Sequence, residues 1–194
     1  MNLTVTFIRH APTIANKEGI FMGIQDVSCD VQVLEKSTLK FTDVEKNIVY
    51  CSPLTRAVKS AEYIFPNTPI IIDQRLIEKN LGEWAGQSKE YLRKTIPEAF
   101  LGSGHLNPLY IPKGGESFED LKSRSKLFLK DIVSQFTNNE KDTRIFAVTH
   151  NGVIRTIRCI IEQMEPFEFF KTSELYLTPI DFTFEISEWI KKLK

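Results

Sequence analysis

The feature that most constrains the fold is the alternation of short apolar stretches, rich in Val, Ile and Thr, with longer amphipathic stretches. The short ones have the composition of buried strands and cover residues 3–8, 47–51, 69–73, 144–149, 175–178 and 181–186. Strands that alternate with helices usually pair side by side in the same direction. The order therefore predicts an α/β fold with a mostly parallel sheet covered by helices on both faces.

The helices expected between the strands have recognisable starts. The longest covers residues 117–136, and its first residues, Ser117 and Asp120, resemble a capping box. Its apolar face consists of Phe118, Leu121, Phe128, Leu129, Ile132 and Phe136. Ser52 and Pro53 fit the N-cap and first position of a second helix that runs to residue 65, and a third helix is expected over residues 152–163.

The length of the chain, 194 residues, suits a single domain over 1–194. The stretch 86–115 differs from the rest because Gly and Pro interrupt it repeatedly. We expect it to be an insertion, made of one helix and loops, that covers one edge of the sheet and the active site there.

Composition narrows the partners and the compartment. Lys plus Arg and Asp plus Glu number 25 each, so the net charge of zero gives no footprint for nucleic acid or a membrane surface. Cys29, Cys51 and Cys159 are widely spaced and odd in number, which argues against a disulfide framework or a zinc site. The sequence has no signal-peptide pattern and no run near the roughly 20 apolar residues of a membrane span. These features predict a cytoplasmic protein.

Charged and histidine side chains stand directly after several predicted strands. Arg9 and His10 follow the first strand, His150 follows the strand that ends at Thr149, and Arg56 and Glu78 follow the two strands between them. Open parallel sheets bind ligands beyond the carboxyl ends of their strands. Each residue alone has an ordinary structural explanation, but their shared position predicts an anion site, and Arg suits phosphate. The third histidine, His105, is interpreted as structural or incidental.

These residue types point to phosphoryl transfer. A neutral imidazole can attack phosphorus and form a phosphohistidine, while arginines offset the charge on the transferring group. A carboxylic acid such as Glu78 can protonate the leaving oxygen and then activate water. The sequence shows no metal-ligand cluster, and we expect no cofactor. It also contains neither a G-x-G-x-x-G motif nor a P-loop, which disfavours a plain nucleotide-binding domain.

Five stretches in order resemble the motifs of one family. They read "IRHAPTIAN", "CSPLTRAVKSA", "LIEKNLGEWAG", "PKGGESFEDLKSR" and "VTHNGVIR". Together they resemble the histidine phosphatase superfamily, whose fold is phosphoglycerate mutase-like, and within it the phosphatase branch with the α-ribazole phosphatases and broad-specificity phosphatases. The resemblance implies a three-layer α/β/α sandwich and a metal-independent hydrolase acting on a small phosphorylated metabolite.

The resemblance also implies roles for particular residues. His10 would be the phosphorylated nucleophile and Glu78 the general acid and base. The residues that would hold the phosphoryl group are Arg9, Asn16, Arg56 and His150, with Thr13 supporting the loop.

Three departures from the family pattern bear on the site. Ala11 stands where Gly is usual, but a backbone carbonyl can still orient the His10 ring, so we expect activity to survive this change. Pro12 stands where a polar residue is common and removes a backbone donor. The segment 27–42 has no match to the usual helix after the first loop, which leaves one side of the pocket undefined.

Alternatives remain open. The chain could be a cofactor-dependent phosphoglycerate mutase-type phosphotransferase or a non-catalytic phosphate-binding domain. Several residues could contact other parts of a substrate, although surface charge or core packing is the more usual explanation for them, namely Lys79, Lys89, Arg93, Lys113, Phe21, Met22 and Trp84. An edge strand at 175–186 could serve a homodimer.

Overall fold

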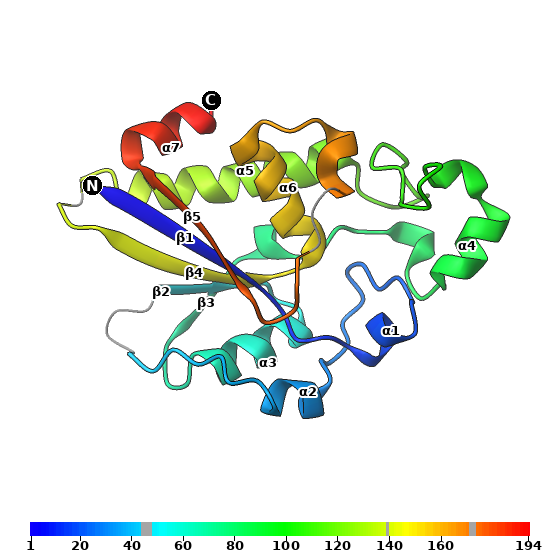
Figure 1. The fold of residues 1–194 in the computed structure, drawn as a ribbon, viewed down its shortest axis with the longest axis horizontal. Helices are drawn as coiled ribbons and strands as arrows, with labels where there is room; N and C mark the ends of the chain where they lie inside the picture. The colour runs from blue at the N-terminus through cyan, green and yellow to red at the C-terminus, as the bar shows by residue number, and fades with distance from the viewer. Residues whose placement is uncertain (44–47, 139, 171–173) are drawn as a thin grey trace.

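The computed structural model describes residues 1–43, 48–138, 140–170 and 174–194 (Figure 1). Five strands form one sheet in the order β3-β2-β4-β1-β5. They are β1 (Asn2–Arg9), β2 (Ile48–Cys51), β3 (Ile70–Ile72), β4 (Thr143–Thr149) and β5 (Pro179–Glu185). All neighbours run parallel except β5, which pairs antiparallel with β1. The predicted mostly parallel sheet is confirmed. Residue 47, predicted to begin the second strand, lies outside the described residues.

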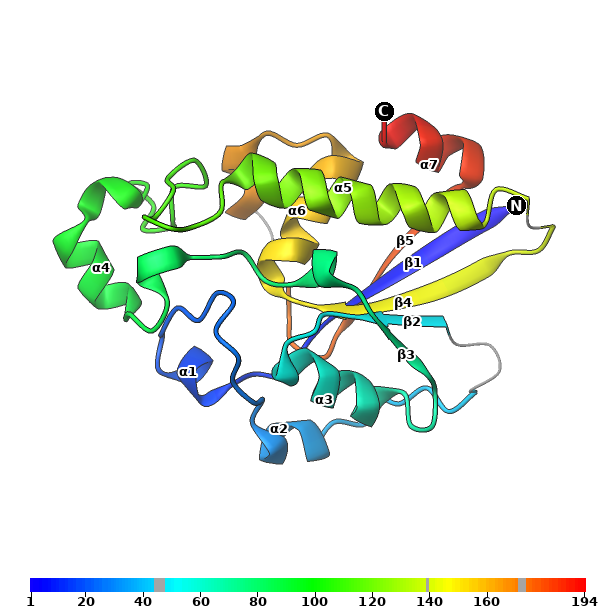
Figure 2. The ribbon, with the colours of Figure 1, turned by 180° about the vertical axis from the view of Figure 1, so that it is seen from behind.

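The period-two alternation of apolar residues gives the sheet two buried faces. Leu3, Val5 and Phe7 pack on one face beneath α5 (Phe118–Gln135), α6 (Asn151–Glu162) and α7 (Ile186–Lys192). Ile8 and Val49 point to the opposite face and pack against α3 (Thr55–Ile64). Figures 1 and 2 show these helices on the two sides of the sheet. The molecule is therefore the expected three-layer α/β/α sandwich.

Helix α5 begins as the capping box predicts. The Ser117 hydroxyl accepts a hydrogen bond from the Asp120 backbone N–H, and the Asp120 carboxylate accepts one from the Ser117 N–H. Five of its six predicted core residues are buried, and Phe136, just past the helix, is half-buried against the same core. The ring of Phe128 meets that of Phe7 edge to face, with the centroids 6.4 Å apart.

The predicted start of the second helix is wrong. Helix α3 begins at Thr55 with Leu54 as its N-cap, so Ser52 and Pro53 precede it. Asp26 from the first loop accepts hydrogen bonds from the Thr55 backbone N–H at 2.7 Å and from the Thr55 hydroxyl at 2.8 Å. This distant carboxylate takes the place of a local cap, which leaves the Ser52 hydroxyl for another partner.

The strand predicted at 175–178 is also wrong. Tyr176 forms only an isolated bridge with Arg9, and Leu177 has a φ of 52°, in the left-handed region that ends strand geometry. The last strand, predicted at 181–186, begins earlier, at Pro179, and ends at Glu185.

The segments outside the sandwich are short helices and loops. They include α1 (Ile14–Lys17), α2 (Val31–Glu35), α4 (Lys89–Thr95) and the 3-10 helices η2 (Gln74–Leu76), η3 (Gly82–Trp84), η4 (Pro97–Ala99) and η5 (Pro166–Phe170). Helix α2 occupies the divergent segment 27–42 and buries Leu34 with Ala11 and Cys29. Stretch 86–115 contributes α4 and η4 and packs around the buried Trp84. No helix within the described ranges is long and apolar enough to cross a membrane.

Candidate active site

The pairing of β1 with β4 brings the two histidines predicted for the site together. Arg9 is the register partner of Thr149, and the next backbone N–H, that of His10, donates to the Thr149 carbonyl at 3.0 Å. The chain continues from each strand with a histidine, and the ring centroids of His10 and His150 lie 4.9 Å apart. Both imidazoles are buried.

The His10 ring is oriented by the backbone of its own loop. Its Nδ1 lies 2.6 Å from the Ala11 carbonyl oxygen, which can only accept, so Nδ1 carries the proton and Nε2 is left unprotonated. The Ala11 N–H in turn donates to the Ser60 hydroxyl of α3 at 2.9 Å. The expectation that residue 11 can orient the ring without being Gly is confirmed.

His150 is held by a residue that follows β2, the neighbour of β4 on the side away from β1. Its Nε2 lies 2.7 Å from the Ser52 hydroxyl, which also accepts a hydrogen bond from the Leu54 backbone N–H at 3.3 Å. Within the described part of the chain, the buried Nδ1 of His150 has no hydrogen-bond partner. A buried polar atom without a partner is costly, by roughly 1–3 kcal/mol, unless a ligand supplies one.

Two arginines converge on the same place, and neutral backbone oxygens orient both. Arg9 donates to the Glu174 carbonyl at 2.8 Å, and its guanidinium carbon stands 3.6 Å from the Tyr176 ring centroid. Arg56, from the first turn of α3, donates to the carbonyls of Gly23 and Gln25, both at 2.7 Å. Burial lowers the pKa of both guanidinium groups. Carbonyl partners fix their directions without neutralising their charges.

The Glu78 carboxylate lies across the site against the start of α6. One oxygen accepts the Lys79 backbone N–H at 2.8 Å, and the other accepts the Gly152 N–H at 3.3 Å. A Cβ atom at position 152 would stand 2.4 Å from a Glu78 oxygen. Glycine is therefore needed there for the carboxylate to keep this position.

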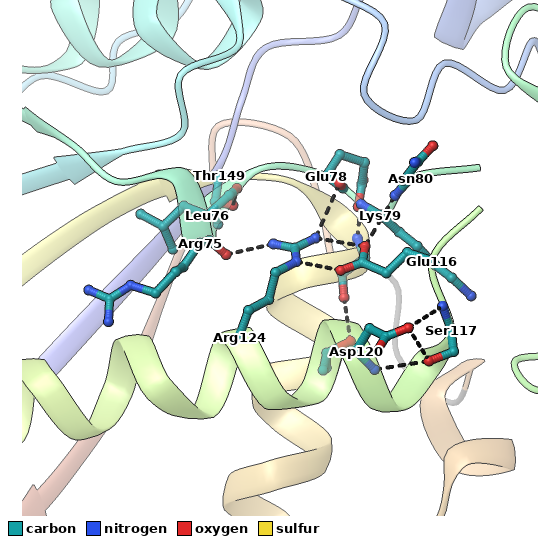
Figure 3. Close-up of polar contacts among 12 residues, drawn as sticks. Arg75, Leu76, Glu78, Lys79, Asn80, Glu116, Ser117, Asp120, Arg124 and Thr149 are labelled. Atoms are coloured by element: carbon teal, nitrogen blue, oxygen red, sulfur yellow. Dashed lines mark hydrogen bonds and ion pairs between the residues drawn. The ribbon is translucent and has the colours of Figure 1, made fainter. Parts of the chain in front are cut away.

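The loop that carries Glu78 is fastened by α5 and β4 (Figure 3). Arg124 of α5 donates to the Arg75 carbonyl at 2.6 Å and to the Glu78 carbonyl at 3.2 Å, and it pairs with Glu116 at 2.6 Å. The Thr149 hydroxyl donates to the Leu76 carbonyl at 2.6 Å. These long-range bonds replace the regular structure that the loop lacks.

These groups border a cavity of about 460 Å³. Five of the predicted site residues line it, namely Arg9, His10, Asn16, Arg56 and Glu78. His150, whose ring centroid is 4.9 Å from that of His10, and Thr13 are not among the lining residues. Thr13 caps α1 by exchanging hydrogen bonds of 3.1 Å with Asn16, which directs the Asn16 amide nitrogen to other partners.

The cavity also contains residues outside the predicted set. His105, interpreted above as structural or incidental, is one of the lining residues. Phe21, Met22, Trp84, Lys79, Lys89 and Arg93 line it as well, whereas Lys113 does not. Among the described residues, no three His, Cys, Asp or Glu side chains lie together as a metal ion would require.

Burial and positive charge keep both histidines neutral. Burial, with the nearby Arg56 guanidinium, lowers the pKa of His10 to about 3. Burial beside His10 and Arg56 lowers the pKa of His150 well below its usual value. An unprotonated imidazole with a free Nε2 is the form in which histidine acts as a nucleophile.

Sequence reasoning missed the roles of four contacts. Ser52 bonds to His150, Arg124 fastens the Glu78 loop, Tyr176 stacks on Arg9, and Gly152 makes room for Glu78. Ser52, Arg124 and Gly152 stand inside the motif stretches quoted above, which was the available signal. Tyr176 stands in a stretch that resembles a strand, so nothing in its surroundings marked it.

The fold and the site together define the class of protein, an α/β sandwich with two histidines and two arginines gathered at the carboxyl ends of its parallel strands. The sequence model of the Histidine phosphatase superfamily (branch 1) matches residues 5–185, and the chain belongs to this superfamily.

Proteins similar to this chain in sequence or structure are named for different activities. The metal-independent phosphoserine phosphatase of Arabidopsis thaliana is 30% identical over 82% of this chain and 68% of its own. A 2,3-bisphosphoglycerate-dependent phosphoglycerate mutase of Gloeobacter violaceus is 27% identical over 92% of this chain and 84% of its own. The crystal structure of the α-ribazole phosphatase of Shigella flexneri superposes with a TM-score of 0.74 at 24% identity, covering 93% and 89% of the two chains.

The lowered pKa of His10 predicts a pH dependence of stability. The imidazole titrates near 6.5 when unfolded and at about 3 when folded, so only the unfolded chain takes up a proton between these values. The contribution of the neutral His10 ring to the free energy of unfolding is therefore fully present above pH 6.5 and is lost as the pH falls toward 3. Between pH 7.5 and 5, His10 should account for a loss of about 2 kcal/mol.

Chemical denaturation in phosphate-free buffer would measure this loss. His10→Gln should lose about 2 kcal/mol less than the wild type over this range, while the control His105→Gln, at an exposed position, should follow the wild type. Equal losses in His10→Gln and the wild type would contradict the buried neutral imidazole.

Proposed function

We propose that the protein is a metal-independent phosphomonoester hydrolase that acts on a small phosphorylated metabolite. During the reaction a phosphohistidine forms at His10. The observation that carries the proposal is the orientation of His10. Its Nδ1–H is committed to the Ala11 carbonyl, and the buried ring lines the cavity beside two arginines that donate to backbone carbonyls.

In the first step, the phosphoryl group lies against Arg9, Arg56 and the Asn16 amide nitrogen. Nε2 of His10 attacks phosphorus, the P–O bond to the alcohol breaks, and a protonated Glu78 gives its proton to the leaving oxygen. The arginine charges stabilise the oxygens of the transferring group in the transition state.

In the second step, a water molecule takes the place of the departed alcohol. Glu78, now a carboxylate, accepts a proton from this water as its oxygen attacks the phosphohistidine. The P–N bond breaks, phosphate is released, and His10 returns to its neutral form. One carboxyl group serves both steps because the leaving alcohol and the attacking water occupy the same side of phosphorus.

We assign His150 the role of a hydrogen-bond donor to the phosphoryl group. If the Ser52 hydroxyl donates to Nε2, the proton of His150 resides on Nδ1, the buried nitrogen that has no partner among the described residues. Ser52 is then a positioning residue that selects the tautomer.

Membership of the superfamily and the phosphoserine phosphatase relative support hydrolysis. The phosphoglycerate mutase relative supports the alternative of transfer between substrates rather than to water. The two reactions share the phosphohistidine and differ in the acceptor, so one experiment can distinguish them.

The first prediction from this mechanism concerns His10 itself. Wild-type protein with a chelator should release phosphate from p-nitrophenyl phosphate or other phosphomonoesters, and His10→Ala should release none, because the nucleophile is gone. Rapid quenching with ³²P-labelled substrate should trap an alkali-stable label on His10.

Three outcomes decide between the candidate functions. Turnover that the chelator abolishes contradicts metal independence. Turnover that persists in His10→Ala contradicts the phosphohistidine. A label on His10 that is discharged by phosphoglycerate but not by water indicates the mutase reaction.

A second prediction uses Gly152 to move Glu78 without changing it. In Gly152→Ala the new methyl group displaces the carboxylate, and kcat should fall about 10- to 100-fold, within the usual contribution of general acid–base catalysis. Stability should be kept or raised by up to about 1 kcal/mol, because Ala is the better helix residue.

Steady-state kinetics and thermal denaturation would measure both effects. The control is Gly102→Ala, at a position where a Cβ meets no atom within 4 Å. If Gly152→Ala keeps the wild-type kcat, Glu78 does not act from the position described above.

A third prediction tests the tautomer of His150. In Ser52→Ala, Nε2 loses its donor, so the ¹⁵N shifts of His150 should move away from the pure Nδ1–H pattern, and kcat should fall about tenfold. Ser125→Ala, which alters another fully buried serine, should leave both unchanged. Unaltered ¹⁵N shifts in Ser52→Ala would contradict the assigned role.

A further inference from the structure

The cavity is larger than a phosphoryl group requires. Its volume of about 460 Å³ lies in the range of sites that enclose a whole small-molecule ligand. The residues proposed to hold phosphate occupy only the end formed by β1, α3 and α6. Most of the remaining wall comes from residues 20–23 of the first loop, from residues 79–84 and from stretch 86–115. In both views α4 lies beyond the end of the sheet (Figures 1 and 2).

The charge of the wall is strongly one-sided. Among the residues that the structure describes, six Lys and Arg side chains line the cavity, Arg9, Arg56, Lys79, Lys89, Arg93 and Arg155, against one acidic residue, Glu78. The chain as a whole is balanced at 25 of each sign, so the excess is local. Arg9 and Arg56 are used by the phosphoryl group. The carboxylates of Glu116 and Glu78 attract Lys79, and those of Glu174 and Glu78 attract Arg155. Lys89 and Arg93 are left, and neither has a role in the mechanism.

We call Lys89 and Arg93 the outer cation cluster. They are one turn apart on α4, and Arg155 of α6 lines the same cavity. The Lys89 ammonium stands 5.3 Å from the Phe21 ring centroid, and Arg93 donates to the Gly104 carbonyl at 2.6 Å. As with Arg9 and Arg56, these contacts orient the two α4 cations without neutralising them.

The members of the cluster act on one another. Burial lowers the pKa of Lys89, and the charges of Arg9, Arg93 and Arg155 lower it further. On the same helix, Lys94 has the ordinary arrangement, an ion pair of 2.7 Å with Glu90 on the outer surface. Cations that share the wall of one cavity repel one another until an anion lies beside them.

We infer that the outer cation cluster is a second anion subsite, and that the substrate carries another anionic group, a carboxylate or a second phosphate, beside the phosphomonoester that is cleaved. This inference rests on the proposed function for the identity of the cleaved group. The protein would then differ in specificity from phosphatases whose substrates carry no charged group other than the phosphate that is cleaved.

Matched ligand pairs test the subsite. Phosphoserine and phosphoethanolamine differ only by a carboxylate, and fructose 1,6-bisphosphate differs from fructose 6-phosphate by a second phosphate. Calorimetry on His10→Ala, which should bind without turnover, is expected to show at least tenfold tighter binding of the more anionic member of one pair. The pair with the larger ratio identifies the group. Wild-type kcat/KM should show the same preference, mainly through KM.

The variant Lys89→Met/Arg93→Met, made with and without His10→Ala, should lose at least ten times more affinity and kcat/KM for the preferred ligand than for its less anionic match. The control Lys94→Met, on the outer face of α4, should keep the wild-type ratio. Equal binding of both members, or equal losses for both in the double variant, would overturn the subsite. A binding preference without any turnover would leave the subsite standing and overturn the proposed hydrolysis instead.

Discussion

The parallel pairing of β1 with β4 is the interaction on which the site depends. The register of Arg9 opposite Thr149 makes the two strands end at the same level, so the residue after each strand is a histidine facing the other. A shift of one residue would turn the alternating apolar residues of β1 to the wrong faces of the sheet, so both cores oppose it. The burial of Leu3, Val5 and Phe7 therefore also fixes where His10 stands.

The site holds its charges with neutral partners. Backbone carbonyl oxygens orient the side chains of Arg9 and Arg56, whereas arginines on a protein surface more often pair with carboxylates. The His10 ring is likewise oriented by the Ala11 carbonyl. Desolvation makes this arrangement costly when the site is empty, which is why both histidines resist protonation. A bound anion offsets the cost, so the free energy stored in the empty site favours binding of the group to be transferred.

Local patterns in the sequence predicted what local physics determines. Apolar alternation located the strands, the Ser117–Asp120 pair located the start of α5, and the strand ends located His10 and His150. The errors arose where distant residues decide. Asp26 moves the start of α3 to Thr55, the contact of Tyr176 with Arg9 replaces a strand, and Arg124 reaches back to Glu78 from α5. No periodicity in the chain encodes such contacts, because they exist only after the sheet has formed.

The proposed nucleophile and the proposed acid are positioned by different means, so different parts of the fold can change each of them. His10 is held by its neighbour Ala11 at the end of a central strand, whereas Glu78 depends on Arg124, Glu116 and the start of α6. Both supports belong to the sandwich. The outer wall belongs to α4 and its loops, which pack around Trp84 in a cluster separate from the two sheet cores. Substitutions on α4 can therefore alter which substrate enters while the reacting groups keep their geometry, since a rigid scaffold carries the chemistry and a loop-rich segment carries recognition.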